Sequence, residues 1–165
     1  MRKLIVLTIL ALAIPAAAIA AGTPAQNAAA QANCRAQRTA LGTAVFNQTY
    51  VGTTNANRAN AFGKCVSTAV RSAQANTAAA VTSCRTVQAA DRAAFKTKYG
   101  SFGKCVSTTA SASNQATQAA TIAAAKSCKT ELAAGSAAFM AKYGTATSKS
   151  NAFGKCVSTK VHATS

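Results

Sequence analysis

A nine-residue string that occurs twice constrains this 165-residue chain more than any other feature. Residues 60–68 read Asn-Ala-Phe-Gly-Lys-Cys-Val-Ser-Thr and return unchanged at 151–159, and the last seven of them return at 102–108. Self-similarity at a period of roughly 40 to 50 residues is typical of repeat architectures. The sequence therefore predicts three units on one plan, which open at Cys34, Cys84 and Cys128.

Each unit carries a phenylalanine and, four residues later, a tyrosine. Side chains four apart lie on one face of an α-helix, and a glycine within two residues of each tyrosine supplies the left-handed conformation that ends helices. A short helix with an aromatic pair is therefore expected in every unit. The pairs are Phe46 with Tyr50, Phe95 with Tyr99, and Phe139 with Tyr143. Candidate N-caps precede these pairs (Thr43, Asp91 and Ser136) and the closing motif (Asn60, Ser101 and Asn151).

Two long segments, 64–99 and 104–134, contain neither glycine nor proline and are rich in alanine, the strongest helix former. Each is expected to begin a long helix at one closing motif and to carry it into the next opening cysteine. The first helix has an apolar stripe at Val66, Val70, Ala73, Thr77, Val81, Cys84 and Val87. The second has a weaker stripe at Val106, Ala110, Thr117, Ala120 and Ala124. The expected fold class is all-α, with three disulfide-stapled helical repeat units joined by long Ala-rich helices.

The six cysteines are expected to form disulfides, because alanine stripes bury little area at about 25 cal/mol per Å² and leave a thin core. The spacing alone allows several connectivities. We favour a pair within each unit, because the variable segment after the tyrosine then becomes a loop inside the staple. Each staple would contribute about 3 to 4 kcal/mol in the chain-entropy model. The favoured pairs are Cys34 with Cys65, Cys84 with Cys105, and Cys128 with Cys156; the alternatives join Cys65 to Cys84 or Cys105 to Cys128.

The chain begins with the features of a secretory signal peptide. Met1-Arg2-Lys3 is followed by an apolar run at 4–14, by Pro15 and by small residues that offer a cleavage site near Ala20 or Ala21. We expect an exported protein, secreted or associated with the cell envelope, without a transmembrane segment after processing. The expected organisation is a signal peptide at 1–21, a loose leader passing into helix at 22–33, repeat units at 34–68, 84–108 and 128–159, connecting helices at 69–83 and 109–127, and a C-terminal tail at 160–165.

The charge balance is strongly one-sided, with 18 lysines and arginines against two acidic residues and a formal net charge of +16. Such a chain attracts polyanions, so an anionic cell-wall polymer or polysaccharide is the candidate partner. Its rival is a solvated face whose sign follows from the lack of acids. The candidate contacts are Lys64, Lys104 and Lys155, which a regular stack of units would present as a row, together with Lys98 and Lys142 after the aromatic helices.

Several function classes are disfavoured by what the chain lacks. Its acids, Asp91 and Glu131, lie in different units, and its only histidine is His162, so acid–base catalysis finds no constellation. Asp91 is better explained as a helix cap and Glu131 as an exposed partner of lysine or arginine. No CxxC pair or nucleic-acid-binding motif occurs. We expect no catalytic, cofactor-binding or metal residues and no sequence-specific nucleic-acid binding; the oligomeric state stays open.

The pattern from residue 34 to 159 resembles a group of small exported, Ala-rich actinobacterial proteins. Their chains carry a cysteine, then Phe-x-x-x-Tyr-Gly, then Ala-Phe-Gly-Lys-Cys-Val-Ser, and the resemblance implies no particular activity. This chain departs from that pattern by an inserted residue at Val51 and by a very short connection at 100–101. The expected function is non-enzymatic structural or interaction work at the cell envelope or exterior, with polyanion contact as its most testable form. The alternative is a cationic membrane-active effector against competing cells.

Overall fold

The computed structural model describes residues 22–52, 60–144 and 151–163, and these residues are all-helical. The all-α fold class is therefore confirmed. The expected signal peptide at 1–21 lies outside the described residues. The six helices are α1 (Pro24–Val51), α2 (Ala61–Ala90), α3 (Arg92–Tyr99), α4 (Phe102–Ala134), α5 (Ser136–Tyr143) and α6 (Ala152–His162).

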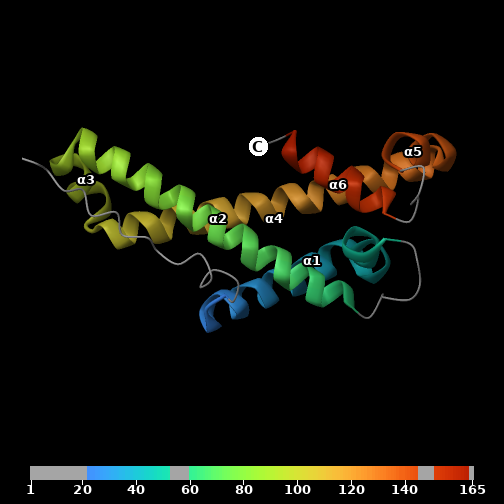
Figure 1. The fold of residues 1–165 in the computed structure, drawn as a ribbon, viewed down its shortest axis with the longest axis horizontal. Helices are drawn as coiled ribbons and strands as arrows, with labels where there is room; N and C mark the ends of the chain where they lie inside the picture. Colours follow the sequence, from blue (N-terminus) through green and yellow to red (C-terminus); the bar gives the residue numbers. More distant parts are fainter. Residues whose placement is uncertain (1–21, 53–59, 145–150, 164–165) are drawn as a thin grey trace, which may run out of the picture.

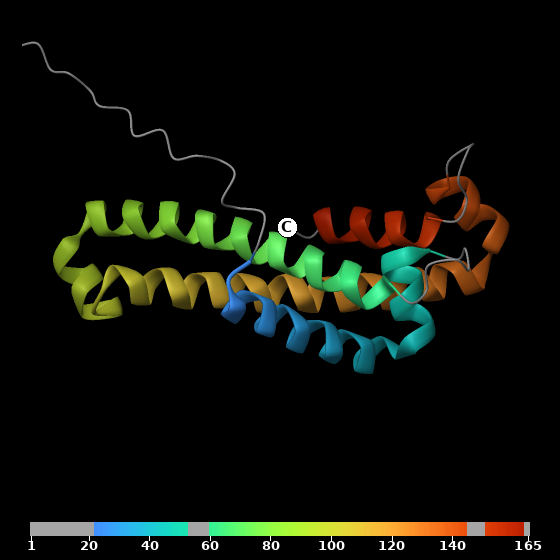
Figure 2. The same cartoon turned by 60° about the horizontal axis from the view of Figure 1, so that its bottom comes forward.

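Two long helices, α2 and α4, form the frame of the molecule and pack against each other in opposite directions (Figure 1). The short helix α3 joins them at one end. Helix α1 packs against α2 and α4, and α5 and α6 lie at the end remote from α3. Figure 2 shows α2 and α4 running along the long axis, with α1 and α6 on opposite sides of them. The end that carries α3 therefore stands apart from the rest of the fold.

The long helices form where the lack of glycine and proline predicts them, and each continues six residues beyond its opening cysteine. Helix α2 ends at Asp91, whose extended backbone starts α3 at once and whose Oδ1 accepts the N–H of Ala94 at 2.9 Å. Ser101 begins α4 in the same way, because its Oγ accepts the N–H of Lys104 at 3.2 Å. The predicted caps Asp91 and Ser101 are thus confirmed.

The remaining cap predictions are wrong in part. Asn60 and Asn151 precede α2 and α6 but make no capping hydrogen bond, because their ψ values of 1° and 8° are not the extended backbone that aims a side chain at the first free amides. Ser136 is the first residue of α5, and the cap position belongs to Gly135. The Thr43 side chain makes no hydrogen bond within the described structure, and the chain turns one residue earlier, at Gly42, where φ is 74°.

The leader is helical rather than loose from Pro24 onward. Thr23 and Gln26 form a reciprocal capping box, in which Thr23 Oγ1 accepts the Gln26 N–H at 3.2 Å and Gln26 Oε1 accepts the Thr23 N–H at 3.0 Å. Pro24 takes the first helical position, where its missing N–H has no cost. Residues 24–33 are therefore the first turns of α1.

The glycines that follow the tyrosines do not behave alike. Gly52 and Gly100 both have φ of 73°, a region that a side chain disfavours, and the prediction of a left-handed glycine is confirmed for them in the sign of φ. Gly144 has φ of −73° and ψ of 162°, an ordinary extended conformation, so the same prediction is wrong there. The α5 end therefore does not need a glycine for its backbone angles.

The three cystines join the cysteines of each unit, as we favoured: Cys34 with Cys65, Cys84 with Cys105, and Cys128 with Cys156. The units nevertheless do not stack in a line. The first and third share one main core, which includes Phe46, Phe139 and Phe153. The second has a small core of its own, formed by Cys84, Phe95 and Cys105 with Tyr99, Phe102 and Val106 partly buried beside them. We call the segment around this small core, residues 84–106, the tip.

The apolar stripes are mostly turned inward as expected. Val70 and Cys84 are buried on α2, and Ala110 and Ala124 are buried on α4. Val87 is the exception, since 41% of it is exposed and it is the large apolar residue that stands out on the described surface. The prediction that Val87 belongs to the buried stripe is therefore wrong, because Val87 is not among the residues that pack in the small core of the tip.

Candidate functional site

The lysines before the closing cysteines do not form the predicted row. The Cys84–Cys105 cystine places the first turn of α4 beside residue 84, which is 20 residues along α2 from Lys64. At 1.5 Å per residue, Lys104 therefore lies about 30 Å from Lys64 along the helix axis. Lys155 lies in the first turn of α6, which packs in the main core, and is half-buried, whereas Lys64 and Lys104 are exposed. The row fails because the second unit extends away from the other two.

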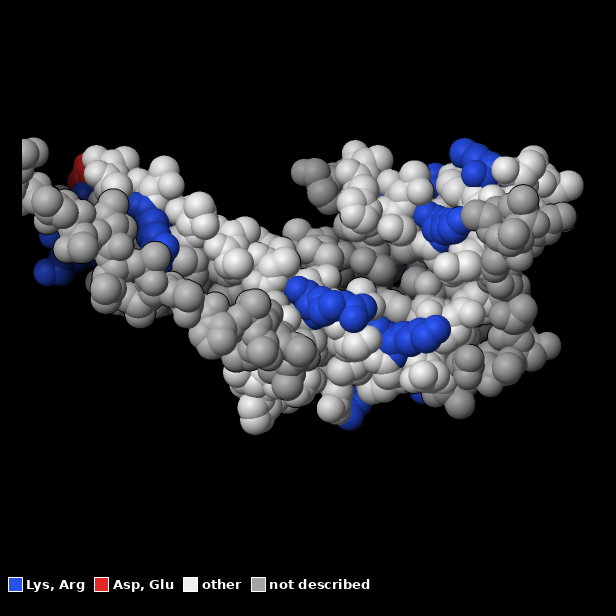
Figure 3. All heavy atoms as spheres, in the orientation of Figure 1, with Lys and Arg blue, Asp and Glu red and all other residues white. Residues whose placement is uncertain are grey.

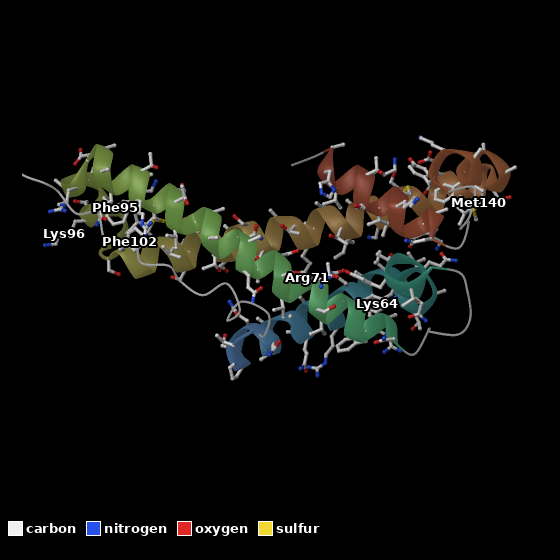
Figure 4. All side chains as sticks on the ribbon, in the orientation of Figure 1. Lys64, Arg71, Phe95, Lys96, Phe102 and Met140 are labelled. Carbon is white, nitrogen blue, oxygen red and sulfur yellow. A yellow bond between two sulfur atoms is a disulfide. The ribbon has the colours of Figure 1, made fainter. Side chains whose placement is uncertain are left out.

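The positive charge is instead distributed in separate groups over the face drawn in Figure 3. One group consists of Lys64 and Arg71, which we call the α2 pair. The two residues are seven apart, about two helical turns, so they share one side of α2. Both are exposed, and Figure 4 shows them following each other along the helix. Arg71 Nη2 also donates to Thr68 Oγ1 at 3.4 Å, which holds the guanidinium over the surface.

A second group surrounds the tip. On α3, Arg92 and Lys96 are four residues apart on one flank of the aromatic pair, and Lys98 lies on the other flank. Figure 4 shows Lys96 pointing away from the ribbon while Phe95 and Phe102 lie together inside the turn, with ring centroids 6.4 Å apart. The tip cations, all exposed, are Arg85, Arg92, Lys96, Lys98 and Lys104.

Glu131 on α4 binds the cations of the third unit internally. Its carboxylate lies 2.7 Å from Lys142 Nζ and 3.3 Å from Lys160 Nζ, and the Tyr143 hydroxyl donates to it at 3.2 and 3.3 Å. The hydrogen bond from Lys142 lowers the pKa of Glu131, and the same bond raises the pKa of Lys142. The prediction that Glu131 partners a basic residue is confirmed, although its side chain is half-buried rather than exposed. Lys142 already pairs with a carboxylate within the protein, and its side chain stays 61% exposed.

The three equivalent tyrosines differ in what their hydroxyl groups contact. Tyr50 donates to Gln37 Oε1 at 2.5 Å, and Tyr143 donates to Glu131. Tyr99 makes no hydrogen bond through its hydroxyl in the part of the chain that the structure describes. The acceptor lies three residues after the opening cysteine, a position occupied by Gln37, Val87 and Glu131 in the three units. Sequence reasoning missed this position, although alignment of the units on their opening cysteines would have revealed it.

Tyrosine 50 provides a test of this buried hydrogen bond. Gln37 is only 5% exposed, so Tyr50→Phe leaves its amide oxygen without a donor and is expected to reduce the free energy of unfolding by about 1 to 3 kcal/mol at neutral pH. Denaturant titration of the purified variant measures this change. Tyr99→Phe is the matched control, for which a change below about 0.5 kcal/mol is expected. Equal losses in the two variants would contradict the assignment.

The hydrogen bond between Tyr50 and Gln37 also predicts that the stability of the protein depends on pH above neutrality. Burial raises the pKa of Tyr50 to about 12, and the hydrogen bond with Gln37 opposes this only in part. The pKa of Tyr50 in the folded protein thus exceeds the ordinary phenol value of about 10. The stability that the protonated Tyr50 hydroxyl contributes is therefore present below pH 10 and is lost as the pH rises toward about 12. The free energy of unfolding should therefore fall less steeply over that range in Tyr50→Phe than in the native sequence.

A groove of about 450 Å³ lies between α1, α2 and α4. Alanines, hydroxyl residues and amides line it, and no charged side chain does. Several of its polar groups are already paired: Gln118 Nε2 donates to the Asn33 carbonyl at 3.4 Å, and Asn114 Oδ1 accepts from Asn76 Nδ2, outside the lining, at 2.8 Å. The groove therefore reflects the packing of small side chains, and it supplies no group that is poised for chemistry.

Two further findings concern metals and membranes. In residues 22–52, 60–144 and 151–163, no three metal-ligating side chains of the histidine, cysteine, aspartate and glutamate types come together. Over the same ranges, no helix combines the length and apolar character that a bilayer crossing requires. The three cystines indicate an oxidising environment of the extracellular type.

The fold and the surface define a class: a small basic protein of packed helices that three cystines hold together. No protein-family model matches the chain, and neither a curated protein nor a solved structure shows significant similarity to it. The surface of the protein is therefore the feature that bears on its function.

Proposed function

We propose that this protein is exported and acts without catalysis at the cell envelope or exterior, where its basic surface binds an anionic polymer such as a cell-wall polysaccharide. The observation that carries the proposal is the engagement of both acidic side chains of the chain. Asp91 caps α3, and Glu131 is bound by Lys142, Lys160 and Tyr143. The α2 pair and the tip cations consequently face solvent without an ion pair in the described structure, and Asp91, the acid among the tip cations, is used as the cap of α3.

The separation of the two groups favours a polymer over a small anion. Lys64 and Lys104 are about 30 Å apart along α2, whereas electrostatic interactions are screened over about 8 Å at physiological ionic strength. Each group therefore acts as a local contact of its own. A long polyanion that touches both gains affinity from the second contact without any new interaction at the first.

The membrane-active alternative receives less support from the described surface. An interfacial helix needs bulky apolar residues along one face and cations along the other. The large side chains of α1, α4 and α6 are directed into the main core, and Val87 is the exposed large apolar residue of the described chain. We place the chain with the group of exported Ala-rich proteins that its motifs resemble as part of this proposal.

The test is retention of the oxidised protein without its leader on polygalacturonate and on cell-wall material, measured from 0.05 to 0.5 M salt. Affinity should fall steeply with salt, and Lys64→Gln with Arg71→Gln should weaken binding about five- to thirty-fold at low salt, as two surface ion pairs would. Lys126→Gln with Lys129→Gln removes the same charge from α4 and should change affinity less.

Three outcomes would contradict the proposal. Equal retention on uncharged dextran would show that charge is not the basis of binding. Equal weakening by the two double variants would leave only bulk charge. Release of dye from anionic vesicles at the concentrations that saturate the polymer would favour the membrane-active alternative.

A further inference from the structure

The third unit contains a small carboxylate-binding arrangement within the protein itself. Lys142 and Tyr143 are consecutive residues at the end of α5, and both contact one carboxylate, that of Glu131, with Nζ at 2.7 Å and the hydroxyl at 3.2 and 3.3 Å. The ammonium lies 5.0 Å from the Tyr143 ring centroid. A lysine and a tyrosine held side by side in this way supply two converging donors to an anion.

The tip repeats this arrangement in sequence and in geometry. Lys98 and Tyr99 are the last two residues of α3, as Lys142 and Tyr143 are of α5, and a glycine follows each helix, although φ is 73° at Gly100 and −73° at Gly144. Lys98 Nζ lies 5.2 Å from the Tyr99 ring centroid, and the Phe95–Tyr99 centroid distance of 5.1 Å matches the 4.9 Å between Phe139 and Tyr143. The donors of the second unit are thus prepared like those of the third.

The two units differ in the residue that should face the donors. Glu131 follows its opening cysteine by three residues, and Val87 stands at the same position after Cys84. Among the described residues, Lys98 has no ion pair and the Tyr99 hydroxyl has no hydrogen bond, while Val87 is 41% exposed. The first unit offers no such pair of donors to a ligand, because the Tyr50 hydroxyl already donates to Gln37 and because Thr49 occupies the position of the lysine.

We propose that Lys98 and Tyr99 bind a carboxylate of an external polyuronate, in the way that Lys142 and Tyr143 bind Glu131. The inference rests on the proposed function and assigns its polymer contact to the tip. The remaining tip cations add a positive field around the site, with Asp91 as the acid among them. The exposed methyl groups of Val87 add an apolar contact for the carbon face of a sugar ring.

The test introduces a carboxylate into the protein itself, at the position of the second unit that is equivalent to Glu131. Val87→Glu reproduces the Glu131 arrangement and should weaken binding of polygalacturonate about tenfold, the loss expected for one charge-assisted contact. Thr86→Glu is the matched control, because it adds the same charge at the neighbouring exposed position, about 100° around α2, and should change affinity less than twofold. Tyr99→Phe removes one donor without a change in charge and should weaken binding several-fold. Circular dichroism verifies that each variant is folded.

The outcomes separate this inference from the proposed function. Equal weakening by Val87→Glu and Thr86→Glu, with Tyr99→Phe unchanged, would overturn the tip site while polymer binding stands. No retention of the native sequence on polygalacturonate would overturn both. If poly-L-glutamate bound more tightly than polygalacturonate, and if Val87→Glu weakened that binding, the carboxylate would come from an acidic peptide. This result would overturn the polyuronate assignment.

Discussion

Replacement of both Cys34 and Cys65 by alanine is expected to lower the free energy of unfolding by about 4 kcal/mol. This cystine closes a sequence separation of 31 residues, the longest of the three, and ties α1 to α2 in the main core. A small domain gains only about 5 to 15 kcal/mol from folding, and alanine contributes much of this interior. The double variant should therefore lose a large share of its stability, which guanidinium titration of the oxidised protein measures.

The Cys84–Cys105 cystine provides the comparison. It closes 21 residues, so the chain-entropy model assigns it about 3 kcal/mol, but it lies in the small core of the tip. Alanine at both positions should increase amide hydrogen exchange in α3 and the adjoining turns while the main core stays protected. If both double variants exposed α1 and α6 to exchange equally, the tip and the main core would form one cooperative unit.

The second large loss of stability is expected from a substitution at Phe46. It is 1% exposed, belongs to the main core and lies 5.0 Å from Tyr50 between ring centroids. Phe46→Ala should cost about 3 to 5 kcal/mol, because the transfer free energy of the ring is lost and a cavity remains. Thermal unfolding followed by circular dichroism measures the loss.

Phe102→Ala is the matched variant in the tip, where the ring is only partly buried. Its cost should be smaller, about 1 to 2 kcal/mol, because the neighbouring rings can move into the space. The order of the two variants is the decisive result. A loss at Phe102 that equalled the loss at Phe46 would show that the small core contributes as much as the main one.

The parts of the fold that depend on local sequence could be predicted. Alanine-rich segments without glycine or proline became α2 and α4 with nearly the expected bounds. The cystines followed from the plan of each unit, because the two cysteines of a pair enclose the helical segment that carries the aromatic pair of that unit. Asp91 and Ser101 capped their helices because their backbones are extended, as a capping side chain requires.

The packing of the units on one another could not be predicted from the same signals. A repeat shows what each unit contains, and it does not show which faces meet. In the second unit only Gly100 and Ser101 separate α3 from α4, so the turn is tight and the unit remains on the far end of the long helices. The first and third units meet in the main core instead. For this reason the lysine row was wrong, whereas the contrast at Val87 was readable from an alignment of the units on their opening cysteines.

The continuous α2 helix fixes the distance between the α2 pair and the tip cations. Helical rise, and not a flexible linker, sets this distance, which is about 20 Å from Arg71 to Lys104 and about 30 Å from Lys64 to Lys104. Under the proposed function, a polymer fragment shorter than about 20 Å contacts one charged group at a time, whereas a longer strand contacts both groups. The α2 helix would therefore let the protein select polymers by chain length as well as by charge density.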